Sequence, residues 1–159
     1  MSNFAPILFL PIAAVFLLGF GVLWTAIVSL VAKLSGWSEL GKRFAGERPQ
    51  LAAKTFRFAS GSINRGDGTS VFSANYRTCL DVSLSADAIG LEVMFPFRFK
   101  HPPVVIPWGA FRAIRDDSSR FVKRTTFVVA DPRITISLIG RVGVEVGEYC
   151  RERGLFREA

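Results

Sequence analysis

The chain begins with a long apolar stretch and continues as a segment in which polar and apolar positions alternate. Residues 4–32 include no charged side chain, and as a helix these roughly 29 residues would reach about 43 Å at 1.5 Å per residue. About 20 apolar residues suffice to cross a bilayer core of about 30 Å. No basic residue precedes the stretch, and it is longer than the apolar region of a signal peptide. Residues 1–35 are therefore predicted to form a retained transmembrane anchor.

The basic residues near the anchor predict its orientation. Lysine and arginine follow the apolar stretch and do not precede it; they are Lys33, Lys42, Arg43, Arg48, Lys54 and Arg57. Flanks rich in lysine and arginine remain in the cytoplasm, so we expect the N-terminus outside and the C-terminal domain in the cytoplasm. The predicted location is the inner (cytoplasmic) membrane, which the chain crosses once.

Small side chains recur every four residues within the anchor, at Gly21, Thr25 and Ser29. This spacing places them on one helical face, in the small-xxx-small pattern that lets transmembrane helices approach closely. Apolar segments also contain such spacings by chance, so the sequence leaves both alternatives open. As a packing face, these residues predict contact with a second membrane helix, in an integral membrane protein complex or in a homo-oligomer.

A short amphipathic helix is predicted just after the anchor, within the linker segment 36–53. Its apolar positions are Trp37, Leu40 and Phe44, while Lys42 and Arg43 lie away from them. One interpretation places this helix on the membrane surface as an interfacial anchor that contacts membrane lipids. The other interpretation packs the same apolar face on the domain that follows. The pattern favours neither.

From Lys54 onward the apolar period changes to two, which is typical of strands with one buried face. The clearest alternation has five apolar positions between Leu91 and Phe99. Residues 116–119 and the pair Asp131-Pro132 are turn signals between strands. About seven strands are expected, over residues 54–58, 76–84, 91–99, 104–106, 111–115, 121–129 and 133–139.

A helix is predicted after the last strand because Val142, Val146, Tyr149 and Cys150 fall on one helical face. Two glycines inside it weaken such a helix by about 1 kcal/mol each relative to alanine, so we expect it to depend on packing against the sheet. The expected fold class is α+β. The anchor precedes a mainly β domain over residues 54–159, with antiparallel strands in a bent barrel or sandwich and the C-terminal helix as its cap.

This order of elements resembles a pleckstrin-homology-like (PH-like) domain. Gly90 and Leu91 at a strand start, followed by Ile106, Pro107 and Trp108, look like a recurring pattern of bacterial members of that superfold. The aromatic and basic run before Ile106 is similar to that of uncharacterised single-pass bacterial membrane proteins with such a domain. The resemblance implies a bent seven-stranded barrel with a C-terminal helix, and it implies no inherited active site.

No motif in the sequence predicts an active site, a metal or a cofactor. Gly61 and Gly66 have the spacing of a phosphate loop, but Asp67 stands where that loop needs lysine. A strand-to-strand turn is therefore expected over residues 61–70. His101 is the only histidine, and no cluster of cysteines or carboxylates near it would complete a metal site. We expect a protein that is not an enzyme.

Two residue pairs are candidates for catalytic or metal-binding chemistry. Asp116 and Asp117 would act as an acid–base pair only if they were enclosed, and beside two serines they are expected in a solvated turn. Cys79 and Cys150 match no zinc pattern. In a cytoplasmic domain both cysteines are expected to remain thiols.

The net charge is +7, much of it close to the anchor. The other basic residues near predicted strands form a candidate patch for an anionic partner, comprising Arg98, Lys100, Arg112, Arg115, Arg120, Lys123 and Arg124. In PH-like domains, such residues near the loops can hold phosphorylated lipid head groups. The alternative is scattered solvated charge. Nucleic-acid binding is not expected, because the phenylalanines that would stack on bases are predicted to be buried.

Two functions follow from these patterns. The preferred one is a non-enzymatic accessory or scaffolding subunit of a larger membrane protein complex. It would dock through its transmembrane helix and its cytoplasmic PH-like domain. The alternative is a sensor or binder of anionic lipid head groups through the basic patch.

Overall fold

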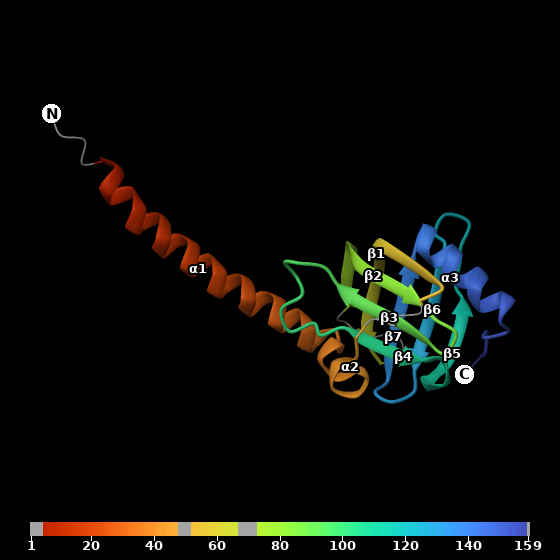
Figure 1. The fold of residues 1–159 in the computed structure, drawn as a ribbon. Coiled ribbons are helices and arrows are strands. Elements are labelled where there is room, and N and C mark those ends of the chain that lie inside the picture. The colour runs from red at the N-terminus through yellow and green to blue at the C-terminus, as the bar shows by residue number, and fades with distance from the viewer. Residues whose placement is uncertain (1–4, 48–51, 67–72, 159) are drawn as a thin grey trace.

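The computed structural model of the chain describes residues 5–47, 52–66 and 73–158. It contains one long apolar helix, a seven-stranded antiparallel sheet and a C-terminal helix, so the expected α+β class is confirmed. The elements are α1 (Ala5–Leu34), α2 (Trp37–Phe44), β1 (Lys54–Arg65), β2 (Ser73–Leu84), β3 (Ala88–Val93), β4 (Val104–Pro107), η1 (Trp108–Ala110), β5 (Phe111–Asp116), β6 (Arg124–Val129), β7 (Ile134–Ile139) and α3 (Arg141–Glu152) (Figure 1).

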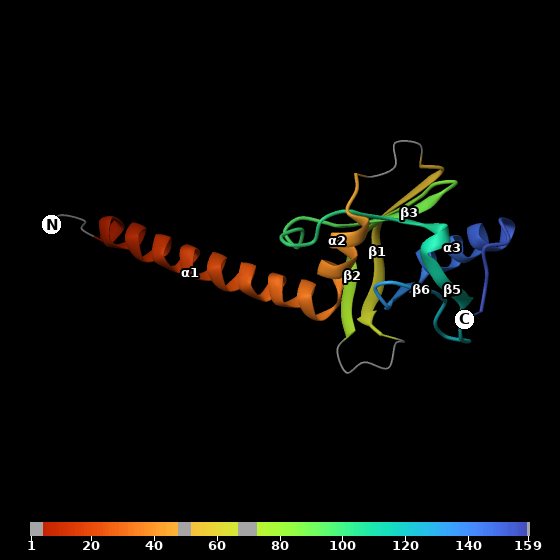
Figure 2. The same ribbon diagram turned by 90° about the horizontal axis from the view of Figure 1, so that it is seen from below.

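Helix α1 is a rod that projects away from the β domain, with the N-terminus at its far end (Figures 1 and 2). Every described side chain from Leu10 to Leu23 is exposed. Towards its C-terminal end the helix meets the domain, where Val28 and Ala32 are buried. By length and composition, Leu10–Leu34 is suited to cross a membrane. The described chain therefore has an apolar rod that its own domain covers only at one end.

The sheet has the order β4-β3-β2-β1-β7-β6-β5 and curls until it is nearly closed. The long central strand β1 makes this possible because it pairs with β2 along its length and with β7 from Ser60 to Arg65. Its register with β2 shifts on either side of Ala59. Phe58 and Thr78, on the two facing strands, have positive φ angles at this point. Such irregularities bend a strand and increase its twist.

Both edges of the sheet are covered by the chain itself. At the β4 edge, Ala45 just after α2 forms a bridge with Val104. At the β5 edge, Ile114 and Arg157 exchange two backbone hydrogen bonds of 2.9 and 3.1 Å between the edge strand and the C-terminal tail. Sheet edges are sites of unwanted pairing unless they are blocked. The segments that flank the sheet therefore close it.

The two short helices pack on the sheet through their apolar faces. Trp37 and Leu40 of α2 are fully buried, so the structure realises the packing alternative for this helix and not the membrane-surface interpretation. The predicted apolar face of α3 is also buried, which confirms the amphipathic pattern. Helix α3 lies at the end of the domain remote from α1 (Figures 1 and 2).

The predicted strand over residues 91–99 is wrong in its second half. Strand β3 ends at Val93, and residues 94–100 form a loop of successive turns. The backbone N–H of Phe97 donates to the carbonyl of Met94, and that of His101 donates to Arg98. Pro96 has no N–H to give to a neighbouring strand. The alternation of phenylalanines therefore belongs to a turn-rich loop.

Two smaller boundaries also differ. β1 continues to Arg65, so residues 61–65 are strand and not turn, whereas residues 67–70 of the same prediction lie outside the described residues. Gly61 is required there because an added Cβ would lie 2.7 Å from the carbonyl oxygen of Ser137 on β7. β6 begins at Arg124, because the N–H of Ser119 donates to the carbonyl of Val122 in a turn.

Candidate functional site at the helix–domain junction

A polar network lies buried where α1 and α2 meet the sheet. The Tyr76 hydroxyl lies 3.0 Å from Nε2 of His101 and 3.3 Å from Oγ of Ser35. His101 Nδ1 lies 3.0 Å from the carbonyl oxygen of Phe99. The Trp37 Nε1–H donates to the Pro102 carbonyl at 2.9 Å. The network joins the end of α1, the start of α2, strand β2 and the loop before β4.

The network is neutral at pH 7. Burial raises the pKa of Tyr76 to about 12. Burial also lowers the pKa of His101 below its ordinary value of 6.5. The phenol therefore keeps its proton and the imidazole stays uncharged. Trp37, Tyr76 and His101 also pack ring against ring at centroid distances of 5.3 to 5.7 Å. This arrangement fixes the helix to the domain and provides no charged reactive group.

A cleft of about 410 Å³ lies beside the network, between α1 and the start of β2. Trp24, Val28 and Val31 line it from the helix, while Arg77 and Cys79 line it from the outer side of β2. Most of its lining is apolar, and the Arg77 side chain supplies a positive charge. Sequence patterns did not predict this cleft, because α1 and β2 are separated by many residues along the chain.

The aromatic loop, residues 94–100, runs along α1 from this network towards the far end of the helix. His101 at its base packs on Trp37 at 5.3 Å, whereas Phe97 packs on Trp24 at 5.2 Å between ring centroids. The Trp24 Nε1–H also points to the carbonyl oxygen of Pro96 at 3.5 Å. Figures 1 and 2 both show the loop beside the inner part of α1. Because Trp24 lies ten residues before the end of α1 at Leu34, the loop reaches about 15 Å back along the helix.

The small residues of α1 lie where the helix leaves the domain. Gly21 is exposed, and an added Cβ would meet nothing within 4 Å. Thr25 and Ser29 are half-buried, and their hydroxyls donate to the carbonyls of Val22 and Thr25 at 2.9 and 2.6 Å. These hydroxyls are satisfied within the helix, so the face can meet an apolar partner without a desolvation cost for them.

The basic residues of α2 face away from its buried side. Arg43 forms an exposed ion pair of 3.2 Å with Asp131 of the β6–β7 turn, and Lys42 is exposed. Phe44 is half-buried against the core. The helix is thus fixed to the domain from both sides.

The predicted basic patch is divided between two places. Arg98 and Lys100 belong to the aromatic loop beside α1; Arg98 pairs with Glu92 at 3.1 Å, and Lys100 Nζ lies 5.7 Å from the centroid of the Phe99 ring. The other five residues are exposed on β5, on the β5–β6 turn and at the start of β6, towards α3; they are Arg112, Arg115, Arg120, Lys123 and Arg124.

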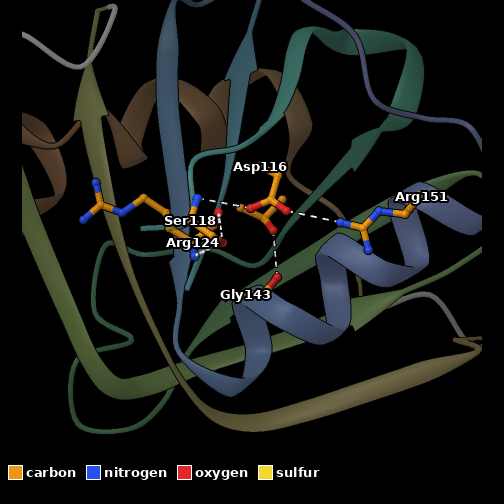
Figure 3. Close-up of polar contacts among 6 residues, drawn as sticks. Asp116, Ser118, Arg124, Gly143 and Arg151 are labelled. Atoms are coloured by element: carbon orange, nitrogen blue, oxygen red, sulfur yellow. Dashed lines mark hydrogen bonds and ion pairs between the residues drawn. The ribbon is translucent and has the colours of Figure 1, made fainter. Parts of the chain in front are cut away.

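Arg124 of this second group belongs to a polar cluster that links the β5–β6 turn to α3 (Figure 3). Asp116 accepts a hydrogen bond from the Ser118 N–H at 3.1 Å and pairs with Arg151 of α3 at 3.2 Å. The Ser118 hydroxyl and the backbone of Arg124 close the turn at 3.0 and 3.3 Å. Hydrogen bonding from Ser118, together with the charge of Arg151, lowers the pKa of Asp116. Asp116 is thus an exposed carboxylate, and this geometry offers no enclosed acid–base pair.

The residues of the PH-like signature have structural positions. Gly90 and Leu91 are buried in β3, where Gly90 pairs with Val105 of β4. Ile106 is buried in β4, and the exposed Pro107 ends that strand. The Trp108 Nε1–H donates to the Ser85 carbonyl at 3.1 Å. These five residues hold the β3–β4 edge to η1.

Within residues 5–47, 52–66 and 73–158, no three His, Cys, Asp or Glu side chains are grouped as metal ligands would be. Cys79 on β2 is half-buried, and Cys150 on α3 is buried, and both are free thiols. Burial raises the pKa of Cys150 to about 12. Neither thiol is therefore ionised enough at pH 7 to be a reactive thiolate.

Sequence reasoning missed the contact of Trp24 with the aromatic loop and the network around Tyr76. The only signals were a tryptophan inside an apolar span and a histidine next to two prolines. A comparison of the chain with protein-family models and with curated protein sequences finds no match.

Proposed function

We propose that this chain is a non-enzymatic single-pass membrane protein that acts as an accessory or scaffolding subunit of a larger membrane assembly. The observation that carries the proposal is the uncovered half of α1. All described side chains from Leu10 to Leu23 are exposed, although the β domain has a buried hydrophobic core of its own. Such a surface requires lipid or another membrane helix.

The domain is proposed to be PH-like and to face the cytoplasm. Support for the fold comes from the seven antiparallel strands, the order β4-β3-β2-β1-β7-β6-β5 and the helix α3 after the last strand. Support for the orientation comes from the basic residues that follow α1, of which Lys42 and Arg43 are exposed.

The junction network supports a scaffolding role. Ser35, Tyr76 and His101 connect α1 to the sheet by hydrogen bonds, and Ala32 of α1 is part of the domain core. A partner that holds the outer half of α1 therefore also positions the β domain.

The test is gentle extraction of the tagged full-length protein from its native membrane, followed by native mass measurement and identification of co-purifying chains. We expect a stoichiometric complex with another membrane protein. A protein that is recovered alone and monomeric would contradict the accessory role.

Two glycines of α1 provide a matched pair for the same measurement. Gly21 and Gly19 are both exposed with open space around them, but two residues on a helix turn by about 200°, so they lie on nearly opposite faces. Gly21→Leu should release the partner if the small-residue face is the docking face, and Gly19→Leu should retain it. Equal retention by both variants would exclude that face.

Anionic lipid binding is the second candidate function, and the position of Arg98 and Lys100 favours it. Both lie in the loop that contacts α1, at the level where head groups would be met. The double variant Arg98→Gln, Lys100→Gln should lower the amount of co-purifying anionic lipid. The control is Arg112→Gln, Arg120→Gln, which removes two charges from the group remote from α1. A larger loss in the control would place the lipid contact at β5–β6.

A further inference from the structure

We propose that the aromatic loop, residues 94–100, inserts into the bilayer at the boundary between head groups and acyl chains. With the loop and Trp24 at this boundary, the membrane surface would lie ten residues before the C-terminal end of α1. This inference rests on the proposed membrane anchoring by α1. The occupant of the loop's exposed apolar surface is the lipid bilayer.

The first observation is the unusual exposure of the loop. Phe95 is 89% exposed, and Phe97 and Phe99 are 38% and 49% exposed. Moving a phenylalanine ring out of water is favourable, because its apolar surface is poorly solvated there. Three exposed rings within five residues are therefore a costly surface in water, and an apolar medium would remove that cost.

The second observation is the loop's contact with the apolar rod. Phe97 and Pro96 touch Trp24, and the Trp24 ring stacks on Phe20 at 6.1 Å. The exposed surface of the loop is thus continuous with the exposed surface of α1. A bilayer that surrounds the rod at Phe20 also reaches the loop.

The third observation is the length of the rod beyond the loop. From Ala5 to Trp24 the helix has about 20 residues and measures about 30 Å. This length equals the thickness of a bilayer core of about 30 Å. The ten residues from Trp24 to Leu34 add about 15 Å, and along them Val28 and Ala32 are already buried in protein. A hydrocarbon boundary at Trp24 matches the length of the outer part of the helix and the burial of Val28 and Ala32 beyond it, while Ile27 and Leu30 remain exposed there.

The chemistry of the loop suits that depth. Tryptophan and other aromatic rings concentrate at membrane interfaces, and lysine and arginine can extend from there to phosphate groups. Arg98 and Lys100 alternate with the phenylalanines and are exposed. The Phe97 N–H bonds to the Met94 carbonyl within the loop, and the N–H of His101, just after the loop, bonds to the Arg98 carbonyl, at 2.9 Å each. These bonds lower the cost of moving the backbone away from water.

The test is a depth measurement on the full-length protein in liposomes, with a nitroxide label on single cysteines. Cys79→Ser removes the half-buried thiol, and Cys150 is buried. Labels are compared at Phe95→Cys and at Phe121→Cys. Phe121 is the matched control because it is a loop phenylalanine of 91% exposure in the β5–β6 turn, away from α1. Leu17→Cys, in the middle of the exposed rod, reports whether α1 is embedded.

We expect dissolved oxygen to collide with the labels at 17 and 95 more often than a water-soluble nickel chelate does, and the reverse at 121. A lipid-embedded label at 17 with an aqueous label at 95 would overturn the insertion of the loop and leave the anchoring intact. An aqueous label at 17 would overturn the anchoring and the insertion together. Equal, lipid-like exposure at 95 and 121 would also overturn the specific role of the aromatic loop.

A fourth label fixes the boundary. Leu30 is exposed and lies six residues beyond Trp24, about 9 Å along the helix. With the boundary at Trp24, a label at Leu30→Cys should be shallower than the label at 95. A label at 30 as deep as the one at 17 would place the boundary near Lys33 and contradict the proposed position.

Discussion

Helices α2 and α3 cover two ends of the same sheet in different ways. Both follow a glycine of positive φ, Gly36 and Gly140, and neither start has a side-chain cap. Helix α2 is held by a large side chain, Trp37, which is fully buried and hydrogen-bonded. Helix α3 is held by close backbone approach, because an added Cβ at Gly143 would lie 2.6 Å from the Leu138 carbonyl oxygen.

The comparison shows two ways to stabilise a short helix that would not persist alone. At α2 the stabilising free energy comes from a ring that fills space and a network that joins distant segments. At α3 the apolar face is also buried, but Gly143 and Gly147 have no side chain and so let the helix approach β6 and β7 closely. The Thr125 hydroxyl then reaches the Gly143 carbonyl at 2.7 Å. A smaller side chain at Trp37 of α2 should therefore destabilise the protein, whereas at Gly143 of α3 a larger side chain should do so.

The largest effect is expected from Trp37→Ala. Removing a fully buried tryptophan leaves a cavity and should lower the free energy of unfolding by about 3–5 kcal/mol. Chemical denaturation of the full-length protein in detergent, followed by far-UV circular dichroism, measures this change. The exposed Phe121→Ala is the control and should stay within about 0.5 kcal/mol. Similar losses in both variants would contradict the role of Trp37 in holding α2.

Gly143→Ala tests the other end of the comparison. Helix propensity alone predicts a gain of about 1 kcal/mol, but the close Leu138 carbonyl predicts a loss of about 1–3 kcal/mol from overpacking. We expect a loss in the same denaturation measurement. Val144→Ala, on the exposed side of α3, should be nearly neutral. A stabilised Gly143→Ala protein would show that α3 is not held by close approach.

Tyr76→Phe tests the polar part of the α2 end. The variant keeps the ring but removes the hydroxyl that contacts His101 and Ser35. The buried groups left without a partner should cost about 1–2 kcal/mol. Tyr149→Phe is the matched control at the α3 end, because its hydroxyl makes a single hydrogen bond to Ser85 at 2.9 Å. A smaller loss for Tyr76→Phe than for Tyr149→Phe would contradict the importance of the network.

The α2 end should also be sensitive to acid. Burial holds the pKa of His101 below 6.5 in the folded protein, so the unfolded chain binds more protons below that pH. Stability should be complete above about pH 6.5 and should decrease as the pH falls below that value. His101→Gln should flatten this slope. Asp116 does not interfere, because its pKa lies below 3.8. An unchanged slope in the variant would assign the effect to other groups.

The smallest effect is expected from Asp116→Asn. The ion pair with Arg151 links the β5–β6 turn to α3, but both side chains are well exposed. Such pairs contribute about 0–1 kcal/mol. The variant should therefore differ little in stability from the unmodified protein, and this small difference should shrink further at high salt. A loss as large as that of Gly143→Ala would mean that charge, and not close approach, holds α3.

The sequence predicts helices and strands well where the spacing of apolar residues matches the positions that are buried in the structure. The face of α3, the apolar positions 80, 82 and 84 of β2 and the length of α1 all follow from spacing. It fails at Phe95, Phe97 and Phe99, because alternation records which positions are apolar and not what medium surrounds them. The run satisfies the strand pattern in sequence, yet Pro96 and the turns around it exclude a strand.

The candidate site was less accessible to prediction. The apolar pattern of Trp37 and Leu40 was correct for a helix, but it did not distinguish the bilayer surface from the β domain as its partner. The junction joins residues about 40 to 65 positions apart, such as Ser35 with Tyr76 and Trp37 with Pro102. No local spacing encodes those contacts. The division of the basic patch has the same cause, since the loop and β5 are brought to different ends of the domain by the sheet.

The covered edges of the sheet have a further consequence for the proposed membrane-anchored protein. Tethering confines chains to a thin layer and raises their effective concentration for one another. An open edge strand would then recruit its neighbours into continuous sheets. Ala45 on Val104 and Arg157 on Ile114 occupy one position on each edge strand and so hinder such pairing between copies of the proposed membrane-anchored protein. A partner must therefore recognise side chains, loops or the helix, and cannot join the molecule by adding a strand at these two positions.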